Sequence, residues 1–230
     1  CTFCCNPVVT ERKWRTMGID KAIEQLYQLA SDYNLDSIIF WDENMTVNTE
    51  ALNKLAKSIN GKFKWYAQSR VNTLLKYDLE FLEKMGLWRL SCGIESGSPR
   101  ILEKIRKEEK VEEYIAANRL LAKTKISVWY NYIVGFPEET IDDLKLTIKL
   151  SMQILDENPN ANNSTFYILV PYPGTQITES FLESDRLPQN FQDWASFGRY
   201  NFNVPWHAPE MLKLYERIWF SSKKIFFRLP

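Results

Sequence analysis

Apolar segments alternate with amphipathic segments along most of the chain. Five apolar segments are rich in β-branched and aromatic residues, as buried strands are; they span residues 36–43, 63–70, 89–96, 126–135 and 164–172. Between them, apolar residues recur at helical spacing, and the predicted helices span residues 19–33, 49–60, 79–86, 98–124 and 141–155. Strands that alternate with helices predict a parallel sheet with right-handed connections.

Local signals refine these helices. Asn48 or Thr49 is expected to cap the second one, Pro99 suits the first turn of the fourth, and Glu139 is expected to favour the start of the fifth through the helix dipole. The first helix carries an apolar stripe, which predicts that one face is buried, with members Ala22, Ile23, Leu26, Leu29 and Ala30.

The alternation stops after residues 171–175, and Pro, Trp, Asn and Phe become frequent over 181–210. A last amphipathic helix is expected from about Pro209 to Phe220. We interpret residues 181–230 as an extension that packs on the main fold, in part through Trp194, Trp206 and Trp219. A length of 230 residues with 45% hydrophobic residues suits an α/β barrel or a doubly wound sheet.

The overall charge and the cysteines limit the function classes. Lys and Arg together number 29, as do Asp and Glu, so a broad nucleic-acid or membrane-surface footprint is not expected. The sequence contains no run of eighteen apolar residues, so no membrane span is expected. Four cysteines, three of them within the first five residues, are no disulfide framework. They favour a reducing, cytoplasmic setting and a metal or redox role for the cluster.

Polar side chains follow the predicted strands. Because ligands bind at the carboxyl ends of parallel strands, these side chains are expected to converge on one pocket, although loops are polar for other reasons too. The candidates are Asp42, Glu43, Asn44, Gln68, Ser69, Arg70, Glu95, Ser96, Asn131, Gly135 and Tyr172.

Cys1 and Cys4 form a C-x-x-C pair, and its spacing leaves three uses open. A structural zinc site would need distant further ligands. A thioredoxin-like redox pair would lie between a strand and a helix. An iron–sulfur cluster also takes thiolates at this spacing.

Phe3 lies between these two cysteines, and CTFC is similar to the second half of C-x-x-x-C-x-aromatic-C, the signature of radical S-adenosylmethionine (SAM) enzymes. Later segments resemble characteristic blocks of the branch of that family whose members usually carry an N-terminal cobalamin-binding domain. These segments are FWDENMTVN, WYAQSRVNTLLKYD, LSCGIESGSPRIL, YNYIVGFPEET and YILVPYPGT. The resemblance runs from Cys1 to about Thr175.

The resemblance implies an α/β fold, a partial (β/α)6 TIM-like barrel of parallel strands over residues 1–180. The first barrel strand and the first cluster cysteine would precede Cys1, so we expect the chain alone to be inactive. Residues 181–230 would form a helical C-terminal extension.

The resemblance also implies a 4Fe–4S cluster and SAM as cofactors, with reductive cleavage of SAM to a 5′-deoxyadenosyl radical. If a domain outside this chain binds cobalamin, methyl transfer to carbon becomes the leading reaction. The expected partners are a small-molecule or lipid-like substrate and an electron donor such as ferredoxin or flavodoxin.

By the same resemblance, Cys1 and Cys4 would bind iron and Phe3 would lie near the adenine. Three further groups of residues are candidates for contacts with SAM. These are Asp42, Glu43 and Asn44 for its amino group, Arg70, Glu95 and Ser96 for its carboxylate and ribose, and Asn131 and Gly135 for its adenine.

Two alternative functions give these residues other roles. A metal-free barrel hydrolase or aldolase would use Glu95 and Asp42 as acid and base, and a zinc-stabilised domain would have no catalytic role. Cys5 is expected to pack or to lie just behind the cluster ligands, Cys92 to be core, and His207 to be a surface or loop residue. The charged runs at 106–113 and 221–224 are expected to be solvated.

Overall fold

The computed structural model describes residues 1–181, 187–188, 190–196 and 206–225. Five parallel strands form one sheet in sequence order. They are β1 (Ser37–Ile39), β2 (Lys64–Ser69), β3 (Leu87–Glu95), β4 (Ser127–Val134) and β5 (Ala161–Ile168). The predicted α/β fold with parallel strands is therefore confirmed. Because the strand order never reverses, the sheet is of the barrel type and not doubly wound.

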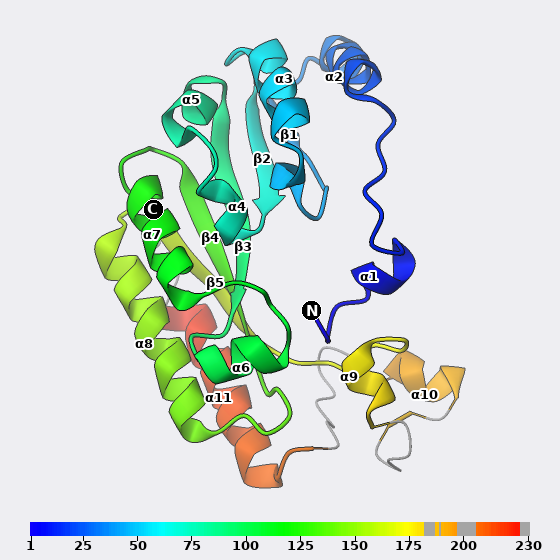
Figure 1. Cartoon of the computed structure of the whole chain (residues 1–230), viewed down its shortest axis with the longest axis vertical. Coiled ribbons are helices and arrows are strands. Elements are labelled where there is room, and N and C mark those ends of the chain that lie inside the picture. Colours follow the sequence, from blue (N-terminus) through cyan, green and yellow to red (C-terminus); the bar gives the residue numbers. More distant parts are fainter. Residues whose placement is uncertain (182–186, 189, 197–205, 226–230) are drawn as a thin grey trace.

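Helices connect successive strands (Figure 1). The longer ones are α2 (Ile19–Tyr33), α3 (Thr49–Ile59), α7 (Val111–Leu121), α8 (Ile141–Glu157) and α11 (Pro209–Ile225). The shorter ones are α1 (Asn6–Val9), η1 (Met45–Val47), α4 (Val71–Leu74), α5 (Leu79–Lys84), α6 (Pro99–Lys104), α9 (Gln176–Glu179) and α10 (Phe191–Ser196). None of the helices in the described part of the chain is long and apolar enough to cross a membrane.

The two faces of the sheet differ because side chains alternate along each strand. One face packs under the helices and is fully buried, with Trp65, Leu90, Cys92, Tyr130, Tyr132 and Phe166. Tyr132 and Phe166 stack there with their ring centroids 4.7 Å apart. Cys92 is core, as expected. The other face, called the inner face below, carries partly exposed residues: Tyr66, Arg89, Ser91, Trp129 and Asn131.

The C-terminal helix packs on β5. The Ser222 hydroxyl accepts a hydrogen bond of 3.4 Å from the backbone N–H of Phe166. Trp206 and Trp219 pack against the core, as expected, whereas Trp194 is half-buried. The side chains of Lys223 and Lys224, in the second predicted solvated run, lie outside the described residues, and Ser222 of that run is buried.

Some element boundaries differ from the prediction. β5 begins at Ala161, because the polar Asn163 is buried in the strand with its amide oxygen bonded to the Tyr132 hydroxyl at 3.0 Å. Leu29 is exposed, so the apolar face of α2 buries only Leu26 and Ala30. Asn48 caps α3 by accepting from the backbone N–H of Ala51 at 3.0 Å.

The predicted helical stretch 98–124 is two helices, α6 and α7. A loop at 105–110 separates them, and Arg106 and Glu108 take left-handed φ values of 51° and 56° there. Left-handed backbone interrupts a right-handed helix. This break turns the loop back toward the carboxyl ends of β2 and β3.

Candidate functional site

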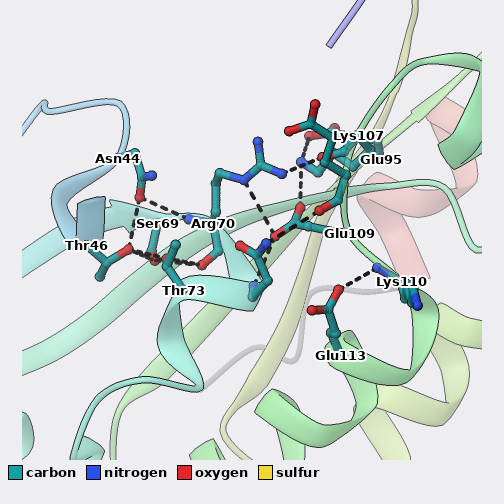
Figure 2. Close-up of polar contacts among 12 residues, drawn as sticks. Asn44, Thr46, Ser69, Arg70, Thr73, Glu95, Lys107, Glu109, Lys110 and Glu113 are labelled. Atoms are coloured by element: carbon teal, nitrogen blue, oxygen red, sulfur yellow. Dashed lines mark hydrogen bonds and ion pairs between the residues drawn. The ribbon is translucent and has the colours of Figure 1, made fainter. Parts of the chain in front are cut away.

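Charged side chains from three segments of the chain meet at the carboxyl ends of β2 and β3 (Figure 2). Arg70 follows β2, Glu95 ends β3, and Lys107 and Glu109 come from the loop between α6 and α7. The Lys107 ammonium lies 2.9 Å from Glu95 Oε1 and 3.3 Å from Glu109 Oε2. Arg70 Nε lies 3.8 Å from Glu109 Oε1, and its guanidinium also donates to the Lys107 carbonyl. We call these four residues the charged cluster.

Three members of the charged cluster are buried, whereas the side chain of Arg70 is 32% exposed. The side chain of Glu109 is 0% exposed and that of Lys107 6% exposed. Burial lowers the pKa of Lys107, but Glu95 and Glu109 more than offset this and leave its pKa raised, so Lys107 is protonated. Buried charges persist only when they are paired.

The expectation that residues 106–113 are solvated is therefore wrong for Lys107 and Glu109. Their charges pair inside the protein with Glu95 and Arg70. A signal was available in the sequence, because apolar Ile105 precedes the run, apolar Val111 lies within it, and both pack against the core. A charged run held by such apolar residues has some of its members directed inward.

The backbone around Glu95 is shaped for its carboxylate. A Cβ on Gly93 would lie 2.2 Å from Glu95 Oε1, so only glycine leaves this space. Glu95 itself has a φ of 66°, in the left-handed region that non-glycine residues rarely adopt. Such strain is characteristic of functional sites.

Asn44 links the end of β1 to the charged cluster. Its amide oxygen accepts from the Thr46 hydroxyl at 2.9 Å and from the backbone N–H of Arg70 at 3.4 Å. The Thr46 hydroxyl also lies 2.6 Å from that of Ser69. Asp42 and Glu43 stay exposed and do not join the charged cluster.

The cysteine segment lies beside the charged cluster. Thr2 donates its backbone N–H to the Ile105 carbonyl at 2.9 Å and accepts from the N–H of Ile177 at 3.0 Å.

Cys1 and Cys4 are half-buried free thiols, and Cys5 is exposed. Burial raises the pKa of the Cys4 thiol, and the nearby Glu43 carboxylate adds to that rise. Cys4 is therefore a protonated thiol at neutral pH in the unliganded protein, and metal binding there would release a proton. Within the described residues no three His, Cys, Asp or Glu side chains gather into a metal site, so any cluster would need a third ligand besides these two cysteines.

Phe3 and Gly135 come together at the end of β4. The Phe3 ring packs edge-on against Phe136, with centroids 5.7 Å apart. Gly135 has a φ of 87°, donates its N–H to Glu139 Oε2 at 2.6 Å, and accepts from the Trp206 indole at 2.9 Å.

Asn131 and Ser96 lie apart from the charged cluster. Asn131 is on the inner face, where its amide donates to Ser91 Oγ at 2.8 Å and accepts from Ser164 Oγ at 2.5 Å. Ser96 is buried against α8, with its hydroxyl 3.1 Å from that of Thr147. Of the predicted strand-end residues, Asn44, Arg70 and Glu95 therefore lie together at the charged cluster. Ser96 and Asn131 do not.

One further expectation is wrong beneath the Gly135 loop, whereas His207 lies in a loop there, as expected, but is buried. Glu139 does not stabilise the start of α8, because Thr140 caps that helix and Asp143 completes the capping box. Glu139 is buried instead, and burial raises its pKa to about 7. His207 is only 6% exposed and packs on Tyr215, with ring centroids 4.9 Å apart. Burial lowers the pKa of His207.

Comparisons with known proteins show which families and structures this chain is similar to. The family described as the radical SAM superfamily matches residues 1–151. An uncharacterized methyltransferase of Pyrococcus horikoshii is 30% identical over 190 residues, which cover 81% of this chain and 40% of that protein. The anaerobic magnesium-protoporphyrin IX monomethyl ester cyclase of Cereibacter sphaeroides is 26% identical over 92% of this chain and 34% of its own length.

A solved structure shares the fold. The radical SAM methyltransferase TsrM from Kitasatospora setae, with cobalamin and a 4Fe–4S cluster bound, superposes with a TM-score of 0.61 at 14% identity. The match covers 75% of this chain and 35% of that one. The chain thus spans well under half of the length of these curated relatives.

Proposed function

This chain belongs to the radical SAM superfamily, and we propose that it is the catalytic core of an enzyme that cleaves SAM reductively at a 4Fe–4S cluster. The observation that carries the proposal is the position of Cys1 and Cys4. Backbone hydrogen bonds of Thr2 hold this pair against the loop that bears Lys107, at the carboxyl ends of the parallel strands. Ligands bind at that end of such sheets.

The thiols fit the proposed cluster. Cys1 and Cys4 are free, half-buried and spaced as iron–sulfur ligands are. They would hold two irons of the cluster, and a ligand from outside the described residues would hold another. When bound, the cluster supplies the electron that breaks the sulfonium C–S bond and so yields the 5′-deoxyadenosyl radical.

The surrounding side chains suit the charged ends of SAM. We assign its carboxylate to Arg70, whose side chain is 32% exposed, and its amino group to Asn44 and the exposed carboxylates Asp42 and Glu43. Glu95 suits the ribose hydroxyls, while Phe3 and Gly135 suit the adenine. Ser96 would act only indirectly, because its hydroxyl is engaged by Thr147 on α8. Pairing across a site of low dielectric gives such contacts their strength.

A finer proposal is methyl transfer to carbon with cobalamin bound by a part of the protein outside this chain. The relative from Pyrococcus horikoshii is called a methyltransferase, and the TsrM structure holds both cobalamin and a cluster. The substrate would be a small or lipid-like molecule and the reductant a ferredoxin or flavodoxin. Free clustered thiols suit the cytoplasm.

The family match disfavours the two alternatives, a metal-free barrel enzyme and a zinc-stabilised domain. The metal-free enzyme predicts that loss of Cys4 does not change its activity. The zinc-stabilised domain predicts that the protein binds zinc and does not bind SAM. The proposed division at residue 180, with 181–230 as an extension, suits the packing of α11 on β5.

The test is anaerobic reconstitution of the protein at its full natural length with iron and sulfide. We expect a cluster, and 5′-deoxyadenosine from SAM after reduction. Cys4→Ser should abolish both, whereas the matched variant Cys5→Ser should retain both, because Cys5 is exposed. A well-folded protein that binds neither iron nor SAM, or one in which Cys4→Ser still forms 5′-deoxyadenosine, would contradict the proposal.

A further inference from the structure

The inner face of the sheet contains a cavity of about 350 Å³ below the candidate SAM site. All five strands or the residues directly after them contribute to it. Ile39, Tyr66 and Arg89 lie side by side on β1, β2 and β3 as register partners. Trp41, Trp88 and Trp129 supply indole rings, and Trp41 is 74% exposed. A barrel interior is ordinarily filled by branched aliphatic side chains, so a hollow lined by aromatic rings needs another explanation.

A bulge in β3 brings two of these residues to the same face. Trp65 pairs with Leu87 and the next residue, Tyr66, pairs with Arg89, so Trp88 is the extra residue. Regular alternation would place Trp88 on the face opposite Arg89. Instead both line the cavity, and the Arg89 guanidinium carbon lies 4.2 Å from the centroid of the Trp88 ring. Bulges next to binding sites commonly redirect a side chain in this way.

Arg89 has aromatic neighbours but no anionic partner. Its guanidinium carbon also lies 5.2 Å from the Trp129 ring centroid. Among the residues that the structure describes, no carboxylate lies within salt-bridge distance of it, and its buried Nε has no hydrogen-bond acceptor. A buried N–H without an acceptor is costly. Arg70, by contrast, is engaged by Glu109 and the Lys107 carbonyl.

We propose that this cavity is the substrate subsite of the radical SAM reaction and that it binds the carboxylate of a substrate with a flat aromatic or conjugated ring. The assignment as a substrate subsite rests on the proposed function. The fork of guanidinium N–H groups matches a carboxylate in two parallel hydrogen bonds. The indole rings around it offer flat apolar surface to the ring system. The guanidinium thus matches the carboxylate of the ligand, and the indole rings match its ring system.

The cavity and the candidate SAM site lie on the same strands, because β3 carries Arg89 in the cavity and ends at Glu95 of the charged cluster. Asn131 lines the cavity, and the Asn131 side chain bridges Ser91 on β3 and Ser164 on β5. Arg89 and Glu95 belong to the same strand, with Ser91 and Gly93 between them, and Glu95 Oε1 lies in the space that a Cβ on Gly93 would take. A substrate held by its carboxylate at Arg89 would therefore extend upward toward the charged cluster.

The test compares naphthoate with its uncharged analogue naphthamide in calorimetric titrations of the full-length protein without reductant. We expect naphthoate to bind about ten- to a hundredfold more tightly, as one charged hydrogen-bonded pair contributes. Arg89→Gln should remove that preference and Arg89→Lys should keep part of it. Arg217→Gln, at an exposed arginine on α11, should leave it unchanged. Trp88→Leu should weaken both ligands, since it removes ring surface and keeps Arg89.

Equal affinities for acid and amide, no binding of either, or an unchanged preference in Arg89→Gln would each overturn the subsite. Comparing the two ligands in the unmodified protein keeps the test decisive even if a variant fails to fold. The outcome is separable from the proposed function, which is measured by 5′-deoxyadenosine in the same preparation. Formation of 5′-deoxyadenosine without carboxylate preference overturns the subsite alone. Carboxylate preference without 5′-deoxyadenosine supports an anion site and overturns the radical chemistry.

Discussion

The ammonium group of Lys107 lies 2.9 Å from Oε1 of Glu95, twelve residues earlier in the chain. The pair spans the end of β3 and the loop after α6, with Glu109 on the other side of the ammonium. Three ionised groups thus share one buried volume, and each depends on the others to remain charged there.

Removing the cation should destabilise the fold. Lys107→Gln leaves Glu95 and Glu109 without their main counter-charge, and breaking a buried pair in this way costs about 3–5 kcal/mol. Urea unfolding gives the measurement. The matched variant Lys104→Gln breaks only the exposed pair with Glu138 and should cost less than about 1 kcal/mol. Equal costs for the two variants would show that the charged cluster is not buried as described.

The space at Gly93 should be specific to the Glu95 carboxylate. Gly93→Ala places a methyl group against Glu95 Oε1 and close to the Lys107 ammonium, and overpacking of this kind costs about 1–3 kcal/mol. In a Glu95→Ala background the same methyl group meets no carboxylate. We therefore expect its cost to fall substantially there, as a double-mutant cycle of unfolding free energies would show. Additive costs would rule out the contact.

Asp143 should stabilise the junction between α6 and α8. Burial raises its pKa, but hydrogen bonds from Arg100, Ser98 and Thr140 outweigh that and hold the pKa of the Asp143 carboxyl well below its usual range. Asp143→Asn should cost about 1–3 kcal/mol at neutral pH, since it weakens several charge-assisted bonds.

The pH dependence follows from the lowered pKa. A carboxyl with a depressed folded-state pKa stabilises the protein above its unfolded pKa and loses that contribution as the pH falls. The difference between the unmodified protein and Asp143→Asn should therefore shrink below about pH 4. The control is Asp142→Asn, at an exposed residue that pairs with the exposed Lys145, and it should change stability little at any pH.

Glu139 should have the opposite pH dependence. Its folded-state pKa is raised to about 7, mainly by burial, so its neutral form is favoured in the fold. The contribution of Glu139 to the free energy of unfolding is fully present below the pKa that this carboxyl has in the unfolded chain. It is lost as the pH rises through 7, by an amount on the order of 3 kcal/mol.

Glu139→Gln mimics the neutral form and should remove this loss. Thermal melts between pH 5 and 8 should show the variant gaining on the unmodified protein as the pH rises. Comparing the two proteins cancels the titration of His207, whose pKa burial lowers. Parallel stability curves over this range would contradict the assignment.

The sheet and the longer helices could be predicted because their apolar periodicity is strong and local. β5 begins three residues before the predicted segment, because Asn162 and Asn163 resemble a loop and only the partner Tyr132 explains a buried asparagine. Likewise, the inward turn of Lys107 depends on Glu95, which no local pattern reveals.

Only the part of the candidate site that has a local sequence signal could be predicted. The cysteine motif and the strand ends carry their own signal, so Asn44, Arg70 and Glu95 could be named in advance. Arg89 and Trp88 could not, because the bulge that unites them is visible only in the pairing of β3 with β2. His207 is buried by Tyr215 of α11, which is a tertiary contact.

The two backbone hydrogen bonds of Thr2 have a consequence for the order of assembly. Their partners, Ile105 and Ile177, lie in distant parts of the chain, and contacts between such distant segments form late because closing long loops is entropically costly. The cysteine segment therefore reaches its final position only after the strands and the helices between them have folded. Iron delivery in the cell would act on a chain that is already folded, and a nascent chain would expose its thiols to oxidation until then.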